Sequence, residues 1–153
     1  FAMSNDAIGA PRPLLPFLKP FYDRVVPLSW PLVRCCVGLI LAVHGWGKIH
    51  RVAAFGESLA KRGYWPGSFL GYLILVIELV GGICIALGLF TRFFAAAAAI
   101  ELGVLTFDYY WGAGFSWTSR GYEYVLMWGV VLFAIALRGG GPYSIDRRIG
   151  KEL

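Results

Sequence analysis

Four long runs of apolar residues, separated by shorter polar segments, dominate the pattern of this sequence. A bilayer core about 30 Å thick needs roughly 20 mostly apolar residues in each helix that crosses it. The pattern therefore predicts an all-α integral membrane protein, a single domain over residues 1–153 whose four transmembrane helices form a bundle. The expected spans are 31–49, 68–89, 93–110 and 122–137.

The segments outside these runs are short and differ in character. Prolines recur throughout the N-terminal tail, residues 1–30, and because proline breaks the interior of a helix, no long helix is expected there. Part of this tail is expected to lie at the membrane interface. Residues 50–67 are expected to form a polar loop, and residues 138–153 a polar, basic tail.

The composition supports a membrane protein: 58% of the residues are hydrophobic and only 15% are charged, whereas soluble domains carry about a quarter charged residues. The net charge is +5, but the basic residues show no pattern of nucleic-acid binding, so orientation on the membrane and attraction to anionic lipid explain them.

The distribution of lysine and arginine sets the expected orientation, because cytoplasmic segments carry more of them. Both termini are expected in the cytoplasm of a protein that crosses the cell's inner (cytoplasmic) membrane several times. Eight basic residues fall on the side of the termini: Arg12, Lys19, Arg24, Arg92, Arg138, Arg147, Arg148 and Lys151. Five fall on the opposite side: Lys48, Arg51, Lys61, Arg62 and Arg120.

Ionisable residues inside the spans are the candidates for function, because charge in a bilayer is costly and normally faces the interior of a bundle. Small residues flank most of them, which lets helices approach closely. The spans are therefore expected to meet at one polar interior. The residues of this expected site are Arg34, His44, Lys48, Glu78, Glu101, Asp108 and Glu123.

At ~1.5 Å rise per residue, His44, Glu78 and Glu101 are expected near the midplane of the membrane. Two interpretations stay open. The charges could pair only to lock the helices together, Lys48 with Asp108 or Glu123, and His44 with Glu78 or Glu101. Alternatively they line a small-molecule or proton-handling pocket that opens toward the outer leaflet.

Other kinds of chemistry have little support. The three cysteines form no C-x-x-C pair, so no redox disulfide motif is indicated. A metal site is not expected, because a His/Glu/Glu set without an E-x-x-H motif is a weak pattern for a helical bundle.

Several spaced motifs resemble the DoxX family. They are Arg34…Gly38…His44-Gly45…Lys48, then Glu78…Gly81-Gly82…Leu87-Gly88-Leu89…Thr91-Arg92, then Gly121-Tyr122-Glu123, and finally Gly141…Ser144-Ile145-Asp146. The resemblance implies a membrane bundle of four helices and an association with electron transfer, since some relatives are small subunits of an archaeal thiosulfate:quinone oxidoreductase. It carries over, as motif positions, Arg34, His44, Lys48, Glu78, Arg92, Glu123 and Asp146.

Together these observations predict a small redox-associated membrane subunit that binds a quinone-like or other hydrophobic ligand within its bundle. Proton chemistry would fall to Glu78, Glu101 and His44, with Lys48 and Arg34 as counter-charges. The expected partners are the lipid bilayer, a quinone and a redox protein, and any enzyme activity would be that of a quinone-linked oxidoreductase. The alternatives are a structural subunit of a larger complex or homo-oligomer and, less favoured, small-molecule transport.

Overall fold

The computed structural model describes residues 14–152, and within them the chain is built from helices. The α-helices are α1 (Lys19–Trp46), α2 (Val52–Lys61), α3 (Gly67–Val76), α4 (Gly82–Leu87), α5 (Thr91–Val104), α6 (Glu123–Arg138) and α7 (Ile145–Ile149). Two π-helical segments, Ile77–Gly81 and Leu105–Tyr110, continue α3 into α4 and extend α5. Short 3₁₀ turns cover Pro16–Leu18, Ile49–Arg51, Trp111–Ala113 and Trp117–Ser119.

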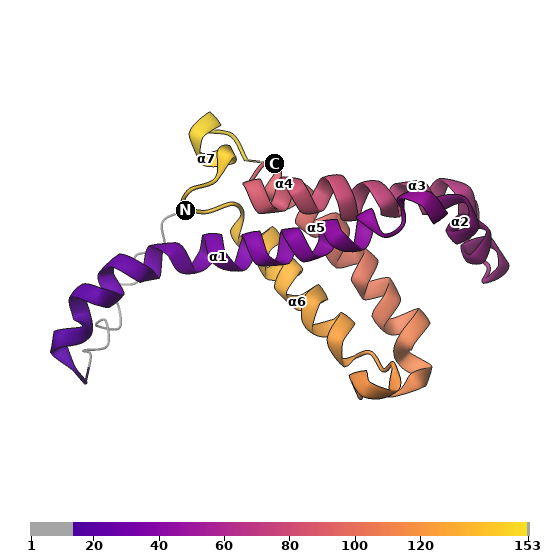
Figure 1. Cartoon of the computed structure of the whole chain (residues 1–153), viewed down its shortest axis with the longest axis horizontal. Helices are drawn as coiled ribbons and strands as arrows, with labels where there is room; N and C mark the ends of the chain where they lie inside the picture. Colours follow the sequence, from indigo (N-terminus) through magenta and orange to yellow (C-terminus); the bar gives the residue numbers. More distant parts are fainter. Residues whose placement is uncertain (1–13, 153) are drawn as a thin grey trace.

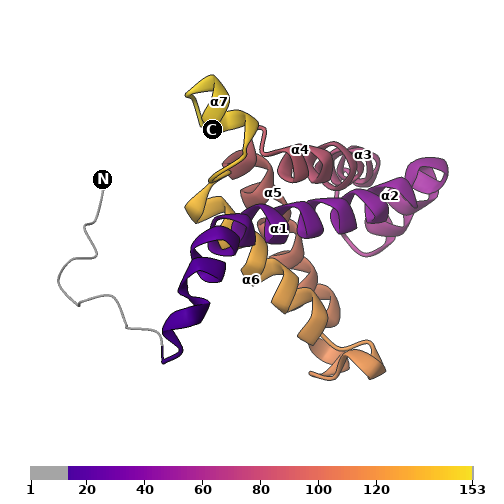
Figure 2. The ribbon, with the colours of Figure 1, turned by 60° about the vertical axis from the view of Figure 1, so that its left-hand side comes forward.

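Two pairs of helices cross each other. In Figure 1, α1 runs beside the continuous α3–α4 helix, while α5 and α6 lie next to each other and pass obliquely across the first pair. Figure 2 shows the same crossing after rotation. The pairs pack most closely near the end of α4, the start of α5 and the end of α6, and α6 diverges from α1 toward its own N-terminal end.

The core lies at this crossing. Its buried side chains come from all four long helices: Val37, Leu41, Ile85, Ala95, Ala98, Leu132 and Ile135. Two of them belong to the alanine run at the start of α5, and small side chains there let α5 approach both α4 and α6.

Glycines set the distance between α1 and the α3–α4 helix. A Cβ atom placed on Gly38 would lie 2.5 Å from the Ala86 nitrogen, and one on Gly45 would lie 2.5 Å from the Leu79 nitrogen. Real Cβ atoms do not approach that closely, so only glycine permits this contact between backbones. The motif glycines Gly38 and Gly45 are therefore packing positions.

Large apolar side chains cover the outside of the long helices. Val43, Ile100 and Phe133, for example, are 71%, 70% and 57% exposed. A water-facing surface rarely carries so much contiguous apolar area, whereas a lipid-facing one requires it. Three helical segments of the described chain are long and apolar enough to cross a membrane: residues 16–61, 67–87 and 91–113.

These features confirm the all-α membrane fold. The fourth predicted span coincides with α6, which has 16 residues and is shorter than the roughly 20 that a perpendicular crossing needs. The count of four spans therefore stays a prediction.

The expectation of no long helix before residue 31 is wrong. Helix α1 starts at Lys19 and contains Pro27 and Pro31, while Pro20 sits in the tolerated first turn. A proline inside a membrane helix is accommodated by a bend and by local re-satisfaction of the freed carbonyl. In Figure 2, α1 bends in this proline-containing half. Pro11 and Pro13 lie outside the described residues.

Two more segments differ from expectation. The predicted loop 50–67 contains α2, whose Val52 and Gly56 pack against α3. The predicted tail 138–153 contains α7 and folds back onto the turn between α4 and α5, where Ser144 and Asp146 are buried. Both segments make tertiary contacts, which the low hydropathy of the sequence there does not reveal.

Candidate functional site in the cleft between the helix pairs

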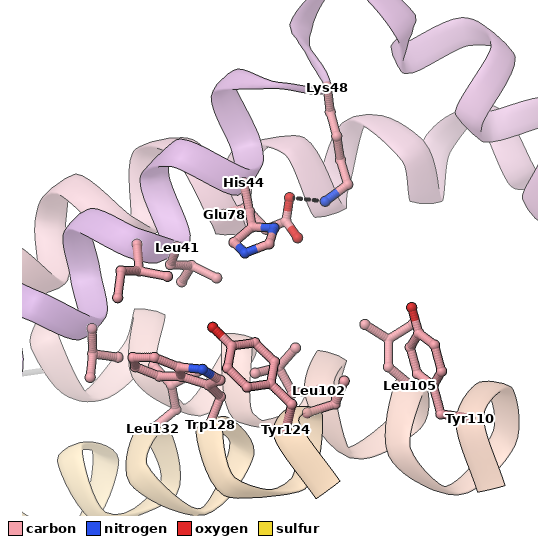
Figure 3. Close-up of a pocket in the computed structure, with 13 residues that line it drawn as sticks. Leu41, His44, Lys48, Glu78, Leu102, Leu105, Tyr110, Tyr124, Trp128 and Leu132 are labelled. Atoms are coloured by element: carbon pink, nitrogen blue, oxygen red, sulfur yellow. Dashed lines mark hydrogen bonds and ion pairs between the residues drawn. The ribbon is translucent and has the colours of Figure 1, made fainter. Parts of the chain in front are cut away.

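Where the two helix pairs separate, they leave a cleft with a cavity of about 250 Å³. Figure 3 shows its two sides: His44, Lys48 and Glu78 on one, and aromatic and aliphatic side chains of α5, its extension and α6 on the other. The full lining is Val37, Ile40, Leu41, His44, Lys48, Glu78, Leu102, Leu105, Tyr110, Tyr124, Val125, Trp128 and Leu132. The charged groups are thus confined to one side of the cleft, where Leu41 also lies, and the other side is aromatic and aliphatic.

An ion pair forms the polar side. Lys48 Nζ donates to Glu78 Oε2, and the two side chains are 23% and 6% exposed. Lys48 follows the end of α1, so its long side chain can reach along the neighbouring antiparallel helix to Glu78. A carboxylate buried this deeply needs such a partner, because an unpaired charge at that depth costs several kcal/mol.

Glu101 lies behind this ion pair. Its charged neighbours are Glu78 and Lys48, and its Oε2 atom is buried with no hydrogen-bond partner among the described residues. The site therefore brings together two carboxyl groups and one lysine. His44 lines the same cleft, so four of the seven predicted site residues come together.

The opposite wall is aromatic. Tyr124 and Trp128 meet edge to face with ring centroids 5.9 Å apart, and the Trp128 Nε1 atom is buried without a hydrogen-bond acceptor in the described chain. Sequence analysis missed these two residues and Tyr110, although Tyr124 and Trp128 are four positions apart in an apolar helix. That spacing places them on one face.

Both π-helical segments border the cleft. One carries Glu78, and the other carries Leu105 and Tyr110. π-helical turns inside α-helices are rare and frequently occur at functional sites, because they re-aim side chains at a cost in helix stability. The helices that border the cleft therefore depart from regular α-helical geometry at this site.

The expected pairing of Lys48 with Asp108 or Glu123 is wrong, because Lys48 pairs with Glu78 and both of those acids bind other groups. Asp108 accepts a hydrogen bond from the Tyr64 hydroxyl, and Glu123 accepts one from the Trp117 amide, 3.2 Å away. The hydrogen bond to Asp108 raises the pKa of the Tyr64 phenol above its usual value. The expected hydrogen bond of His44 to Glu78 or Glu101 is also not formed among the described residues.

Arg34 does not reach toward Glu78. It is 2% exposed and donates to the carbonyl oxygens of Gly140 and Tyr143, at 3.1 and 3.3 Å, at the opposite end of the bundle. The idea of one interior shared by all the intramembrane charges is therefore wrong, and Arg34 serves the C-terminal segment instead.

The remaining motif residues also bind main-chain groups. Asp146 accepts from the amides of Phe90 and Thr91 at 2.8 and 3.0 Å and from the Thr91 hydroxyl at 2.7 Å. Arg92 donates to three carbonyls in the last turn of α6, the shortest contact being 2.6 Å to Leu137. These side chains satisfy helix ends, which have unpaired amides or carbonyls.

Within residues 14–152, no group of three His, Cys, Asp or Glu side chains is arranged to hold a metal ion. Cys35, Cys36 and Cys84 are free thiols.

The fold and the cleft define a class: a small helical membrane protein with a charged, partly aromatic cleft between two crossing helix pairs. The comparison with protein families then identifies the family. The family model named DoxX matches residues 29–111, and the chain belongs to the DoxX family. No curated protein and no solved structure matches the chain.

Proposed function

We propose that this protein binds the ring of a quinone-like, hydrophobic ligand in the cleft and acts as a small membrane subunit of a redox system. The observation that carries the proposal is the two-sided character of the cleft. A ring would pack against Tyr124 and Trp128, while its polar substituents would face His44, Lys48 and Glu78.

Size and polarity both fit such a ligand. A cavity of about 250 Å³ is larger than the ~150 Å³ cavity that admits benzene, so a substituted ring fits while a long tail would extend outside. Quinone carbonyl oxygens accept hydrogen bonds. The Lys48 ammonium and the unpartnered Trp128 Nε1–H are donors at this site.

The redox part of the proposal rests on the family resemblance. It includes a protein redox partner and a location in the inner (cytoplasmic) membrane. The charged side of the cleft supports it indirectly, since quinone reduction consumes protons and Glu78 at the cleft is a group that can carry one.

Filling the cleft tests the proposal. Val125→Phe places a ring inside the cavity, whereas Val130→Phe adds the same ring to the exposed side of α6. We expect Val125→Phe to weaken binding of a short-chain ubiquinone analogue at least roughly tenfold, about 1.4 kcal/mol, and Val130→Phe to leave it unchanged. Quenching of tryptophan fluorescence in purified, detergent-solubilised protein measures the dissociation constant.

Equal binding by both variants, with wild-type folding, would place the ligand elsewhere. Failure of the wild-type protein to bind any quinone analogue would favour the alternative, a structural subunit. One observation supports that alternative: the side chains of Arg34, Arg92 and Asp146 bind groups within this protein, mostly of the main chain, and hold its own helices together.

A further inference from the structure

The carboxyl groups beside the cleft outnumber the cations. Glu78, on the π-helical segment, and Glu101, on α5, neighbour each other, and Lys48 is the one lysine or arginine acting on both in the described chain. If both carboxyl groups were ionised, the site would carry a net negative charge inside the membrane.

Lys48 is not shared equally between the two acids. Its ammonium binds the Glu78 carboxylate, whereas the Glu101 Oε2 atom is buried and has no hydrogen-bond donor among residues 14–152. An ionised carboxylate with a buried, unpartnered oxygen is strongly disfavoured in such a setting. A neutral carboxylic acid removes that cost and lets Glu101 donate a hydrogen bond to Glu78.

We propose that Glu101 holds a proton at neutral pH and exchanges it with Glu78, so that the two carboxyl groups form a proton reserve for the cleft. In the exchange the O–H bond of Glu101 breaks as an O–H bond on Glu78 forms. No electron moves, and the pair keeps one proton and one negative charge, which Lys48 balances.

The ligand-facing half of this inference rests on the proposed function. Glu78 lines the cleft and Glu101 does not, so the one proton stored on Glu101 would move to Glu78 and from Glu78 to a quinone-like ring that the redox partner has reduced. The doubly ionised pair would then take up one proton from water to restore the reserve. Glu101 is then a positioning and proton-storing residue, separated from the ligand by one carboxyl group.

The other groups around the pair do not supply a second cation to Glu101. His44 lies on α1 at the cleft, and α6 contributes Tyr124 and Trp128, of which the Trp128 Nε1–H has no acceptor in the part of the chain described. The charges that act on Glu101 are therefore those of Lys48 and Glu78.

Infrared spectroscopy without any ligand tests the proton reserve separately from ligand binding. Protein in lipid at neutral pH should show the C=O stretching band of a protonated carboxylic acid, shifted in D₂O. Glu101→Gln should remove this band, while Glu57→Gln, which changes an exposed carboxyl group on α2, should leave it.

Lys48→Gln provides the opposite change. Without the lysine, Glu78 also loses its counter-charge, and we expect the band to grow about twofold as a second buried carboxyl group takes a proton. A band that is absent in the wild type, or that survives Glu101→Gln but disappears in Glu78→Gln, overturns the assignment of the proton to Glu101.

Chemical modification of the wild type covers the case in which Glu101→Gln does not fold. Dicyclohexylcarbodiimide reacts with protonated carboxyl groups in membranes, and mass spectrometry should find the adduct on Glu101. Reaction at other acids with none at Glu101 overturns the proposal. If Glu101 holds the proton but no quinone analogue binds, the proposed function fails while the proton reserve stands.

Discussion

At the scale of single residues, two helical glycines differ in their surroundings: one lies at a tight contact between helices and the other faces open space. Gly82 lies where α4 crosses α1, and a Cβ there would be 2.5 Å from the Ala42 nitrogen and 2.6 Å from the Gly38 oxygen. Gly103 on α5 is also helical, but a Cβ there meets nothing within 4 Å. The same substitution should therefore have opposite effects at the two positions.

We expect Gly82→Ala to destabilise the fold by about 1–3 kcal/mol, the usual cost of forcing extra atoms into a packed core. Gly103→Ala should be neutral or stabilise by up to about 1 kcal/mol, because alanine is the better helix former. Thermal unfolding in detergent measures the difference. Equal midpoints for the two variants would contradict the close approach of α1 and α4.

At the scale of elements, several polar side chains anchor the C-terminal segment: Trp30, Arg34, the Arg92–Glu152 ion pair and Asp146. Asp146, 4% exposed, accepts three hydrogen bonds from the start of α5, and the Asp146 amide donates to the Gly88 oxygen at 2.8 Å. The segment around α7 has little apolar surface of its own to bury, so polar contacts such as these attach it to the turn.

Asp146→Ala should release residues 139–152 from the turn between α4 and α5. Leaving the buried donors of Phe90 and Thr91 unsatisfied costs on the order of 3 kcal/mol, and we expect faster proteolysis and amide hydrogen exchange in this segment. Asp23→Ala, which removes an exposed carboxylate paired with Lys19, should cost less than about 0.5 kcal/mol. Unchanged protection in Asp146→Ala would show that other contacts hold the segment.

At the scale of the whole molecule, different segments of the chain gather at the two ends of the helical bundle. The C-terminal segment lies against the turn between α4 and α5, whereas Arg62 and Tyr64, which follow α2, contact Tyr109 and Asp108 at the other end. This arrangement is expected if each long helical segment carries the chain from one side of the membrane to the other.

The excess of basic residues beside the termini predicts which end faces the cytoplasm. With the three cysteines replaced by alanine, a cysteine at Ser119 should react with a membrane-impermeant maleimide in intact cells. A cysteine at Arg148 should react only after permeabilisation. Both positions are exposed in the structure. The reverse labelling pattern would invert the topology.

The sequence alone predicted best those properties that depend on many residues at once. Long apolar runs can be satisfied in a bilayer only by helices, so the fold class followed from hydropathy, and the cost of intramembrane charge singled out His44, Lys48, Glu78 and Glu101. The α2 helix was also within reach, because Val52, Phe55, Gly56 and Leu59 repeat at helical spacing, but the charges around them suggested a loop.

Only the tertiary structure decided how those charges are used. Helical periodicity shows which face of its own helix a residue occupies, but not the angle at which two helices cross. α5 and α6 pass obliquely over α1, and in this arrangement Lys48 pairs with Glu78, whereas Asp108 and Glu123 bind Tyr64 and the Trp117 amide. The same crossing holds Glu101 beside that ion pair and places Tyr124 and Trp128 opposite it, which creates the cleft.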